Sequence, residues 1–236
     1  MSGGGTVLVT GASRGIGRAV AEALAADGFD LVLWARAAAE LDEARAALHG
    51  PVQVRTAAVD VSRPEAVAGE RERSLAGLPG LRGVVLCAGV GEWAPLEETT
   101  PAAWRTMLDT NLGGAFLALR EALPLLRAVP HAQVVVLGSD SGEVGMPGRT
   151  AYCASKWGLR GLAESLRAEE RPGGLRVTQL LVSRVDTHFR GRVPGDRPGA
   201  LTAAQVARLV STVFAQDPQV ELREIRMSSI HTPYGE

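Results

Sequence analysis

The sequence predicts an α/β fold in which helices cover both faces of one doubly wound parallel sheet. Short apolar runs rich in β-branched residues alternate with longer amphipathic stretches, as expected for repeated strand–helix–strand units. The apolar runs lack a regular polar alternation, which is typical of parallel strands that are buried on both faces. A chain of 236 residues, 46% of them hydrophobic, can bury such a core, so we predict a single domain over residues 1–236.

Seven apolar segments are predicted strands, and amphipathic segments between them are predicted helices. The strands are expected at residues 6–10, 30–35, 52–60, 83–89, 132–139, 175–183 and within 220–229. The helices are expected at about 15–28, 37–50, 63–77, 101–127, 150–170 and 202–215. The glycine- and proline-rich segment at 190–200 is predicted to be a mobile loop inside the domain rather than a linker.

Composition argues against several classes of partner. The net charge is −1 and the charged residues are dispersed, which argues against nucleic acid or an anionic membrane as a partner. No apolar run approaches the roughly 20 residues that span a bilayer. The segment MSGGGTVLVTG lacks the basic region of a secretory signal, and Cys87 and Cys153 are expected to be reduced thiols rather than a disulfide. We therefore predict a cytoplasmic protein, with no metal site.

A glycine-rich turn follows the first predicted strand and opens the first predicted helix. Gly11, Gly15 and Gly17 in TGASRGIG permit positive φ and a close approach of a diphosphate to the backbone. The helix that follows offers free N–H groups and the positive end of its dipole. Glycines also occur at such turns for packing alone, but their place after the first strand favours a dinucleotide.

The end of the second predicted strand indicates which dinucleotide is bound. An acidic residue usually lies there in proteins that bind the adenosine 2′-hydroxyl of NAD, whereas this chain has Ala35 and Arg36. Arg36, together with Arg14 from the glycine turn, would pair with a 2′-phosphate. The alternative is that both arginines are simply solvated. We expect NADP(H) rather than NAD(H).

Tyr152 and Lys156, in the segment TAYCASKWG, are four residues apart and would lie on one face of a helix. Lys156 is the only lysine in the chain, and every other long cationic side chain is arginine. A nearby ammonium is expected to lower the pKa of the phenol from its usual value of about 10. The pair is a candidate general acid/base, although the same spacing also arises by chance on helix surfaces.

Two polar residues strengthen this interpretation. Ser139 ends the fifth predicted strand, and ligand chemistry in open α/β sheets gathers at such strand ends. Asn111, the only asparagine, lies within a predicted helix, where asparagine is unfavourable because its side chain competes for backbone hydrogen bonds.

Taken together and in this order, the motifs resemble the short-chain dehydrogenase/reductase family over nearly the whole chain, which implies a Rossmann-type fold. The segment at 10–17 is similar to the family's cofactor turn, Asp60–Val61 to its adenine contact, and CAG at 87–89 to its N-A-G segment, with Cys87 in place of asparagine. Asn111, Ser139, Tyr152 and Lys156 match its catalytic tetrad in spacing and order.

The resemblance implies hydride transfer between a nicotinamide and a carbonyl or secondary alcohol. Tyr152 would exchange a proton with the substrate oxygen, Ser139 would polarise that oxygen, Lys156 would bind the nicotinamide ribose, and Asn111 would hold a water behind the lysine. The predicted cofactor-binding residues are Gly11, Ser13, Arg14, Gly15, Ile16, Gly17, Arg36, Asp60, Val61, Ala88, Gly89, Tyr152, Lys156, Val185 and Thr187.

The chain departs from the family pattern in two segments. In SRVDT at 183–187, Ser183 and Arg184 replace a proline and a glycine, while Val185 and Thr187 remain. Arg184 would either alter the nicotinamide pocket or bind an anionic substrate, and the sequence leaves both open. The C-terminal segment at 223–236 lacks the family's common ending. Self-association as a homodimer or homotetramer, through the helices at 101–127 and 150–170, is expected from the resemblance.

The expected function is that of an NADP(H)-dependent oxidoreductase acting on a small-molecule carbonyl/alcohol pair. A non-catalytic dinucleotide-binding sensor or scaffold is the alternative, followed by an isomerase or dehydratase on the same fold. Candidate substrate contacts, each equally compatible with a loop or packing role, are Trp93, Asp140, Glu143, Met146, Arg184, His188 and Phe189.

Overall fold

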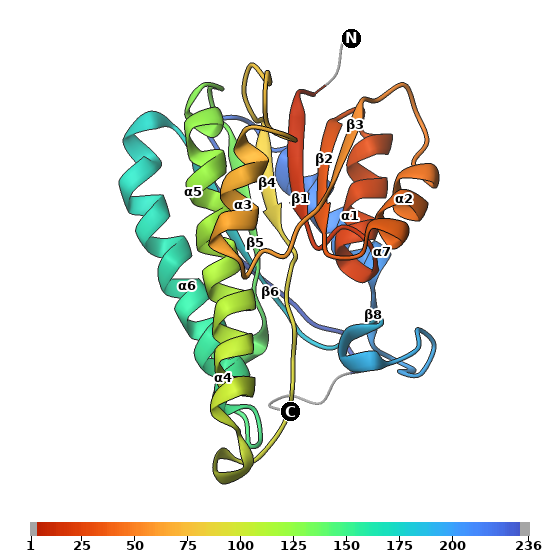
Figure 1. The fold of residues 1–236 in the computed structure, drawn as a ribbon, viewed down its shortest axis with the longest axis vertical. Coiled ribbons are helices and arrows are strands. Elements are labelled where there is room, and N and C mark those ends of the chain that lie inside the picture. Colours follow the sequence, from red (N-terminus) through yellow and green to blue (C-terminus); the bar gives the residue numbers. More distant parts are fainter. Residues whose placement is uncertain (1–3, 232–236) are drawn as a thin grey trace.

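A seven-stranded, wholly parallel sheet forms the centre of the molecule (Figure 1). The computed structural model describes residues 4–231. The strands are β1 (Thr6–Thr10), β2 (Asp30–Ala35), β3 (Val54–Ala58), β4 (Gly83–Leu86), β5 (Gln133–Leu137), β6 (Arg176–Val182) and β9 (Glu224–Met227). Their order across the sheet is β3-β2-β1-β4-β5-β6-β9, so the direction of winding reverses between β1 and β4. The predicted doubly wound parallel sheet is confirmed.

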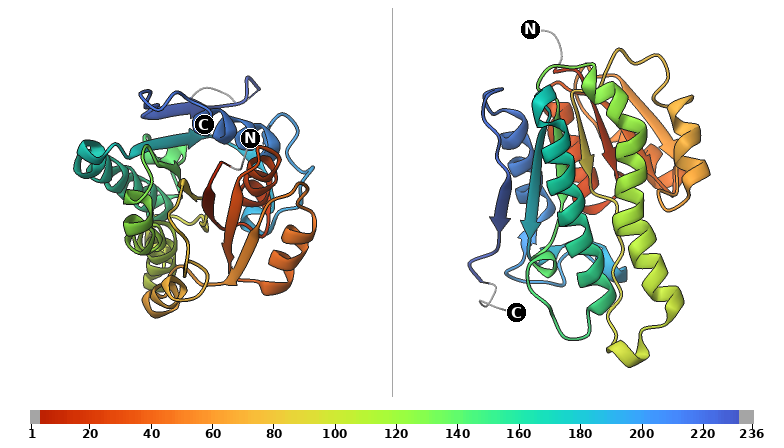
Figure 2. Two further views of the ribbon diagram at one scale, coloured as in Figure 1. Left: turned by 90° about the horizontal axis from the view of Figure 1, so that it is seen from above. Right: turned by 90° about the vertical axis from the view of Figure 1, so that its left-hand side faces the viewer.

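Helices cover both faces of the sheet (Figures 1 and 2). One layer contains α1 (Gly15–Ala26), α2 (Ala38–Ala46) and α7 (Ala203–Phe214), and the other contains α3 (Pro64–Arg71), α4 (Pro101–Leu108), α5 (Gly114–Arg127) and α6 (Thr150–Glu170). In β1, Leu8 packs into the core beneath α5 and α6, whereas Val7 and Val9 pack into the core beneath α1 and α7. Both faces of a central strand are therefore buried, which explains its unbroken apolar sequence.

The third predicted helix is shorter than expected. It ends at Arg71 rather than near residue 77, because the Glu70 carbonyl accepts hydrogen bonds from the N–H groups of both Arg73 and Leu75. This wide turn directs Ser74 into the core, where its hydroxyl accepts a hydrogen bond of 2.9 Å from the Trp34 indole N–H. The hydrophobic periodicity of residues 63–77 cannot reveal this contact, because Trp34 lies forty residues earlier, on β2.

The predicted helix at 101–127 consists of three consecutive helical segments. A π-helical segment at Asp109–Gly113 joins α4 to α5 and contains Asn111. A wide π turn disrupts the regular backbone pairing and is often found at functional sites. The single asparagine of the chain thus lies at the one irregular segment of this long helix.

Two short parallel strands pair with each other in the segment that follows β6. Strand β7 (Val185–Asp186) pairs with β8 (Leu201–Thr202), so the predicted loop at 190–200 leaves and returns at neighbouring points. This pair was not predicted from the sequence, because two-residue strands have no periodicity to detect. The mobility of the loop stays a prediction. Within residues 4–231, no helix combines the length and apolar character needed to span a bilayer. Residues 232–236 of the divergent C-terminal segment lie outside the described residues.

Candidate active site

A pocket of about 1070 Å³ lies at the carboxyl ends of the parallel strands. Its wall includes the residues that directly follow β1, β2, β4, β5 and β6, and it therefore spans the point between β1 and β4 where the strand order reverses. Ligands of open α/β sheets bind at this kind of position. All fifteen predicted cofactor-binding residues line the pocket, as do Ser139, Tyr152 and Lys156 of the predicted tetrad, whereas Asn111 does not.

The glycine turn brings two backbone segments into contact that a side chain would separate. Gly11 has φ +66°, and a Cβ atom there would lie 2.8 Å from the Cα of Ala88. A Cβ atom on Gly17 would lie 2.2 Å from the Gly11 carbonyl oxygen. Both glycines are thus required by the close packing of the turn itself, which is a structural role in addition to any contact with a ligand.

The first turn of α1 faces this pocket through Gly15, Ile16 and Gly17. No side chain caps the N-terminus of the helix. The N–H groups of its first turn have no partner within the helix, and together with the helix dipole they favour an anion there. A close-packed glycine turn, a helix N-terminus and a cavity of this volume fit the diphosphate and nucleosides of a dinucleotide.

Charged groups lie at the adenosine end predicted for the pocket. Arg14 and Arg36 both line it and are both exposed. Burial raises the pKa of Asp60, but hydrogen bonds from Ser62 and the charges of Arg36 and Arg63 outweigh it, so the pKa lies below its usual value. Asp60 is therefore an ionised acceptor at neutral pH.

Glu40 is a residue of this end that the sequence analysis missed. It lines the pocket, and its carboxylate accepts a hydrogen bond of 3.0 Å from the Ser13 hydroxyl. A carboxylate so close to the predicted phosphate site opposes a 2′-phosphate, whereas it suits a ribose hydroxyl. The residue lies in α2, several positions beyond the strand end at which an acidic group was sought.

Tyr152 and Lys156 lie one turn apart on α6, as predicted, and the Lys156 Nζ atom is 5.7 Å from the centre of the Tyr152 ring. Burial raises the pKa of Tyr152 to about 12, although a hydrogen bond with the Ser139 hydroxyl acts in the opposite direction. The expectation that the ammonium lowers the phenol pKa is therefore wrong for this structure. Loss of hydration is the largest cause of this shift, and the Ser139 hydrogen bond and the Arg149 charge oppose it only in part.

The pKa of Lys156 is lowered, whereas that of Tyr152 is raised. Lys156 is 5% exposed, and its Nζ donates a hydrogen bond of 2.9 Å to the Leu137 carbonyl at the end of β5. Burial lowers the pKa of Lys156 to about 8. At neutral pH the site thus combines a neutral phenol with an ammonium whose proton is held less firmly than usual.

Ser139 lies directly after β5 and already has polar partners. Its hydroxyl donates to Asp140 Oδ1 at 2.7 Å and accepts from the Ser141 N–H at 3.2 Å. The hydroxyl proton must turn away from Asp140 before it can be donated to a substrate oxygen. Asp140 is predicted from the sequence only as a substrate contact, and the structure adds its hydrogen bond with Ser139.

Asn111 is buried and holds the loop after β4. Its Oδ1 accepts from the Val90 N–H at 2.7 Å, and its Nδ2 donates to the Val90 carbonyl and to the Ser155 hydroxyl, both at 3.0 Å. Both amide protons are therefore used, and one lone pair of Oδ1 remains for a water. The structure gives Asn111 a definite role in positioning this loop.

The segment after β6 forms the part of the pocket wall that adjoins the glycine turn. Val185 and Thr187 are buried, and the Thr187 methyl lies beside Gly15. Arg184 is exposed and lines the pocket, and its backbone carbonyl accepts a hydrogen bond from the Leu201 N–H. Its side chain thus extends to the pocket mouth, and its backbone belongs to the β7–β8 connection.

The predicted substrate contacts divide into two groups. Trp93, Asp140, Arg184, His188 and Phe189 line the pocket. Two others do not: the Glu143 carboxylate is bound by the Arg226 guanidinium, and the Met146 sulfur accepts a hydrogen bond from Arg149 at 2.7 Å. Pocket arginines that the sequence analysis missed are Arg149, Arg190, Arg192 and Arg197.

Comparison with known proteins identifies the family. The model of the short chain dehydrogenase family matches residues 5–197. The chain belongs to this family. An uncharacterized oxidoreductase of Mycobacterium tuberculosis is 32% identical over 89% of this chain and 79% of its own length. Sulfoacetaldehyde reductase of Chromohalobacter salexigens is 31% identical over 94% of this chain and 92% of its own.

Solved structures agree with this assignment. An alcohol dehydrogenase from the archaeon Thermococcus sibiricus, complexed with 5-hydroxy-NADP, superposes with a TM-score of 0.91 at 30% identity and covers 97% of each chain. A metagenomic short-chain oxidoreductase in complex with NADP superposes with a TM-score of 0.79 at 32% identity, over 95% of this chain and 97% of its own. The Rossmann-type fold and the expected family of dehydrogenases and reductases are confirmed.

Proposed function

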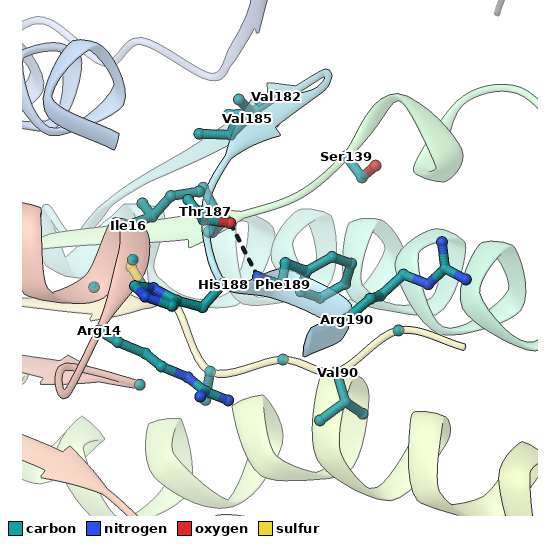
Figure 3. A pocket seen from close by; sticks show the side chains of 18 of the residues that line it. Arg14, Ile16, Val90, Ser139, Val182, Val185, Thr187, His188, Phe189 and Arg190 are labelled. Atoms are coloured by element: carbon teal, nitrogen blue, oxygen red, sulfur yellow. Dashed lines mark hydrogen bonds between the residues drawn. The ribbon is translucent and has the colours of Figure 1, made fainter. Parts of the chain in front are cut away.

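We propose that the protein is an NADP(H)-dependent oxidoreductase that interconverts a small-molecule ketone or aldehyde and its alcohol. The observation that supports this most directly is the convergence of Ser139, Tyr152 and Lys156 on the pocket that the glycine turn also borders. Figure 3 shows Arg14 and Ile16 on one side of this pocket and Ser139 on the other. The two sides would receive the nucleotide and the substrate respectively.

The bound nicotinamide would supply or accept the hydride. In the reductive direction, the Tyr152 hydroxyl donates its proton to the substrate oxygen as that oxygen becomes negative. Because the pKa of Tyr152 is raised to about 12, the phenol is fully protonated at neutral pH and ready to donate. Ser139 turns its hydroxyl proton from Asp140 to the same oxygen, and the Lys156 ammonium stabilises the phenolate that remains.

A Tyr152→Phe variant tests this role. It should lower kcat for carbonyl reduction by at least about 100-fold, the usual contribution of a positioned acid, while NADPH affinity measured by fluorescence stays near that of the wild type. Trp104→Phe, a change on the exposed surface of α4, is the matched control. Wild-type turnover by Tyr152→Phe would refute the assignment.

The preference for NADP(H) rests on Arg14 and Arg36, and Glu40 is the feature that favours NAD(H). We expect Arg36→Ala to weaken NADPH binding about 10-fold more than NADH binding, because one charge-assisted contact to the 2′-phosphate is lost. Glu40→Gln should strengthen NADPH binding, since it removes a neighbouring negative charge. Equal effects of Arg36→Ala on the two cofactors would overturn the preference.

A sensor or scaffold without turnover is the second candidate, and the replacement of proline and glycine by Ser183 and Arg184 favours it. Loss of NADPH absorbance with a panel of ketones, aldehydes and quinones separates the two candidates. Tight NADPH binding without turnover on any member of the panel would favour the sensor.

Self-association through α5 and α6 also belongs to this proposal, as does a cytoplasmic location. Phe116 on α5 and Trp157 on α6 are 48% and 50% exposed, and a partner subunit would cover these large apolar side chains. Light scattering of the wild type and of a Phe116→Glu variant tests a homodimer or homotetramer.

A further inference from the structure

An aromatic and cationic cluster lies beside the Tyr152 ring. Trp93, from the loop after β4, packs edge-on against Tyr152 with ring centres 4.8 Å apart. The guanidinium carbon of Arg190 lies 4.4 Å from the centre of the Trp93 ring, and that of Arg149 lies 5.0 Å from it. Two cations thus share one indole, and that indole contacts the proposed proton donor.

Neither guanidinium is neutralised by the protein. Within residues 4–231, neither Arg149 nor Arg190 forms a salt bridge with a carboxylate; Arg149 donates to the Met146 sulfur. Burial lowers the pKa of Arg190, and so do the positive charges of Arg192 and Arg149, while the exposed Glu92 partly opposes them. Among residues 4–231, these like charges are therefore held together without a salt bridge to a carboxylate, an arrangement that an anion would stabilise.

The backbone of one of these arginines has an uncommon conformation. Arg190 has φ 63° and ψ 35°, a left-handed conformation that residues with a Cβ atom seldom adopt. Among residues 4–231, His131 is the other non-glycine residue with positive φ. Strained conformations of this kind persist where surrounding contacts impose them, and they concentrate at ligand sites.

The cluster is separate from the arginines proposed for the adenosine end. Figure 3 shows Arg190 on the side of the pocket that contains Ser139, and Arg14 on the side that contains Ile16. Around the whole pocket, arginine and lysine side chains outnumber the carboxylates of Glu40, Asp60, Asp140 and Asp196. The carboxylate nearest the catalytic residues, Asp140, already accepts hydrogen bonds from Ser139 and Ser141.

We propose that the substrate carries a carboxylate a few carbons from its reacting carbonyl or alcohol, and that Arg149 and Arg190 bind this carboxylate over Trp93. The inference deepens the proposed function and rests on it. The reaction is unchanged: the carbonyl carbon gains a hydride from the reduced cofactor, its oxygen gains the Tyr152 proton, and the carboxylate is not altered. Guanidinium groups bind carboxylates through paired N–H donors, which would also fix the orientation of the carbonyl.

Matched substrates test the charge requirement. The substrates 4-oxobutanoate and 5-oxopentanoate would be compared with their methyl esters, which keep the carbonyl but lack the charge. We expect kcat/KM to be at least about 10-fold higher for one of the acids than for its ester. The same kcat/KM measurement is made with analogues in which a sulfonate or a phosphate replaces the carboxylate. If a sulfonate or phosphate exceeds every carboxylate, the assigned anion is wrong, and if every ester equals or exceeds its acid, the anion site itself is refuted.

Variants at the two arginines identify the site. Arg149→Gln and Arg190→Gln should each reduce the acid-to-ester ratio of kcat/KM by about 10-fold, and Arg149→Lys should restore part of that loss. Arg208→Gln, at an exposed position of α7 away from the pocket, is the control and should leave the ratio unchanged. An unchanged ratio in both pocket variants would overturn the proposal.

A binding measurement separates this inference from the proposed function. Tyr152→Phe loaded with NADP⁺ cannot complete the proposed reaction, so calorimetry reports the affinity of 4-oxobutanoate and its methyl ester without turnover. Preferential binding of the acid, lost on adding Arg190→Gln, supports the anion site even if the wild type reduces no carbonyl, a result that would refute only the proposed function. Equal binding of acid and ester would refute the anion site even if the wild type is an active reductase.

Discussion

The buried ammonium of Lys156 should make the folded protein less stable than it would be with an apolar side chain at the same position. The Nζ atom has one described hydrogen-bond partner, the Leu137 carbonyl, and the side chain is 5% exposed. Replacing Lys156 by Met removes the charge and keeps a long unbranched side chain that can fill the same space. We therefore expect Lys156→Met to be more stable than the wild type at neutral pH, although it loses activity.

The magnitude follows from the pKa shift. Burial lowers the pKa of Lys156 from 10.5 to about 8, which corresponds to about 3 kcal/mol of unfavourable free energy when the group is protonated. Loss of the hydrogen bond to Leu137 offsets about 1 kcal/mol of the gain. Lys156→Met should therefore unfold with a free energy about 2 kcal/mol higher at pH 7.

The same pKa shift determines how the free energy of unfolding of the wild type changes with pH. Below pH 8 both the folded and unfolded wild type hold the lysine proton, so the penalty is fully present. Between pH 8 and 10.5 the unfolded chain binds more protons at this lysine, and the wild type regains stability by up to about 1.4 kcal/mol per pH unit. The raised pKa of Tyr152 acts oppositely above pH 10, but it is present in both proteins and cancels in their difference.

Urea unfolding at a fixed protein concentration, from pH 7 to pH 10, measures this difference. The advantage of Lys156→Met should shrink as the pH rises above 8, while Arg208→Met, which removes an exposed charge on α7, should show no such trend. A variant that is less stable than the wild type at pH 7, or a difference that does not change with pH, would refute the reasoning.

Three further predictions concern the same region. Lys156→Arg should lower kcat at least about 100-fold, because a planar guanidinium cannot replace a buried ammonium; steady-state rates within a few-fold of wild type would contradict this. Gly11→Ala should destabilise the protein by about 2 kcal/mol more than Gly77→Ala in urea unfolding, since both have positive φ but only Gly11 has backbone atoms within 3.0 Å of the added Cβ. Asn111→Ala should reduce the free energy of unfolding by about 2–3 kcal/mol, because the Val90 N–H and carbonyl lose their partners, and a negligible change would exclude that role.

The sequence by itself determined the fold class and most of the pocket wall. Parallel strands must be apolar on both faces, so their number and order along the chain are visible as β-branched runs separated by amphipathic helices. The carboxyl ends of such strands meet at one edge, which is why the residues that follow them could be grouped into one site before any geometry was known. Tyr152 and Lys156 are four residues apart, and in any α-helix this spacing places both side chains on one face. They could therefore be assigned to that site together.

Protonation and pairing were decided only by the tertiary structure. The pKa of Tyr152 depends on how much water surrounds the phenol, and Trp93 and Phe189, from segments distant in the sequence, contribute to its burial by packing against its ring. Glu40 accepts a hydrogen bond from Ser13, which lies 27 residues earlier in the chain. Arg149 and Arg190 both lie against the indole of Trp93, which belongs to a third segment. Electrostatics depends on distance and burial, not on neighbours in sequence, so residue types alone could indicate a dinucleotide site but not the charge of the substrate beside it.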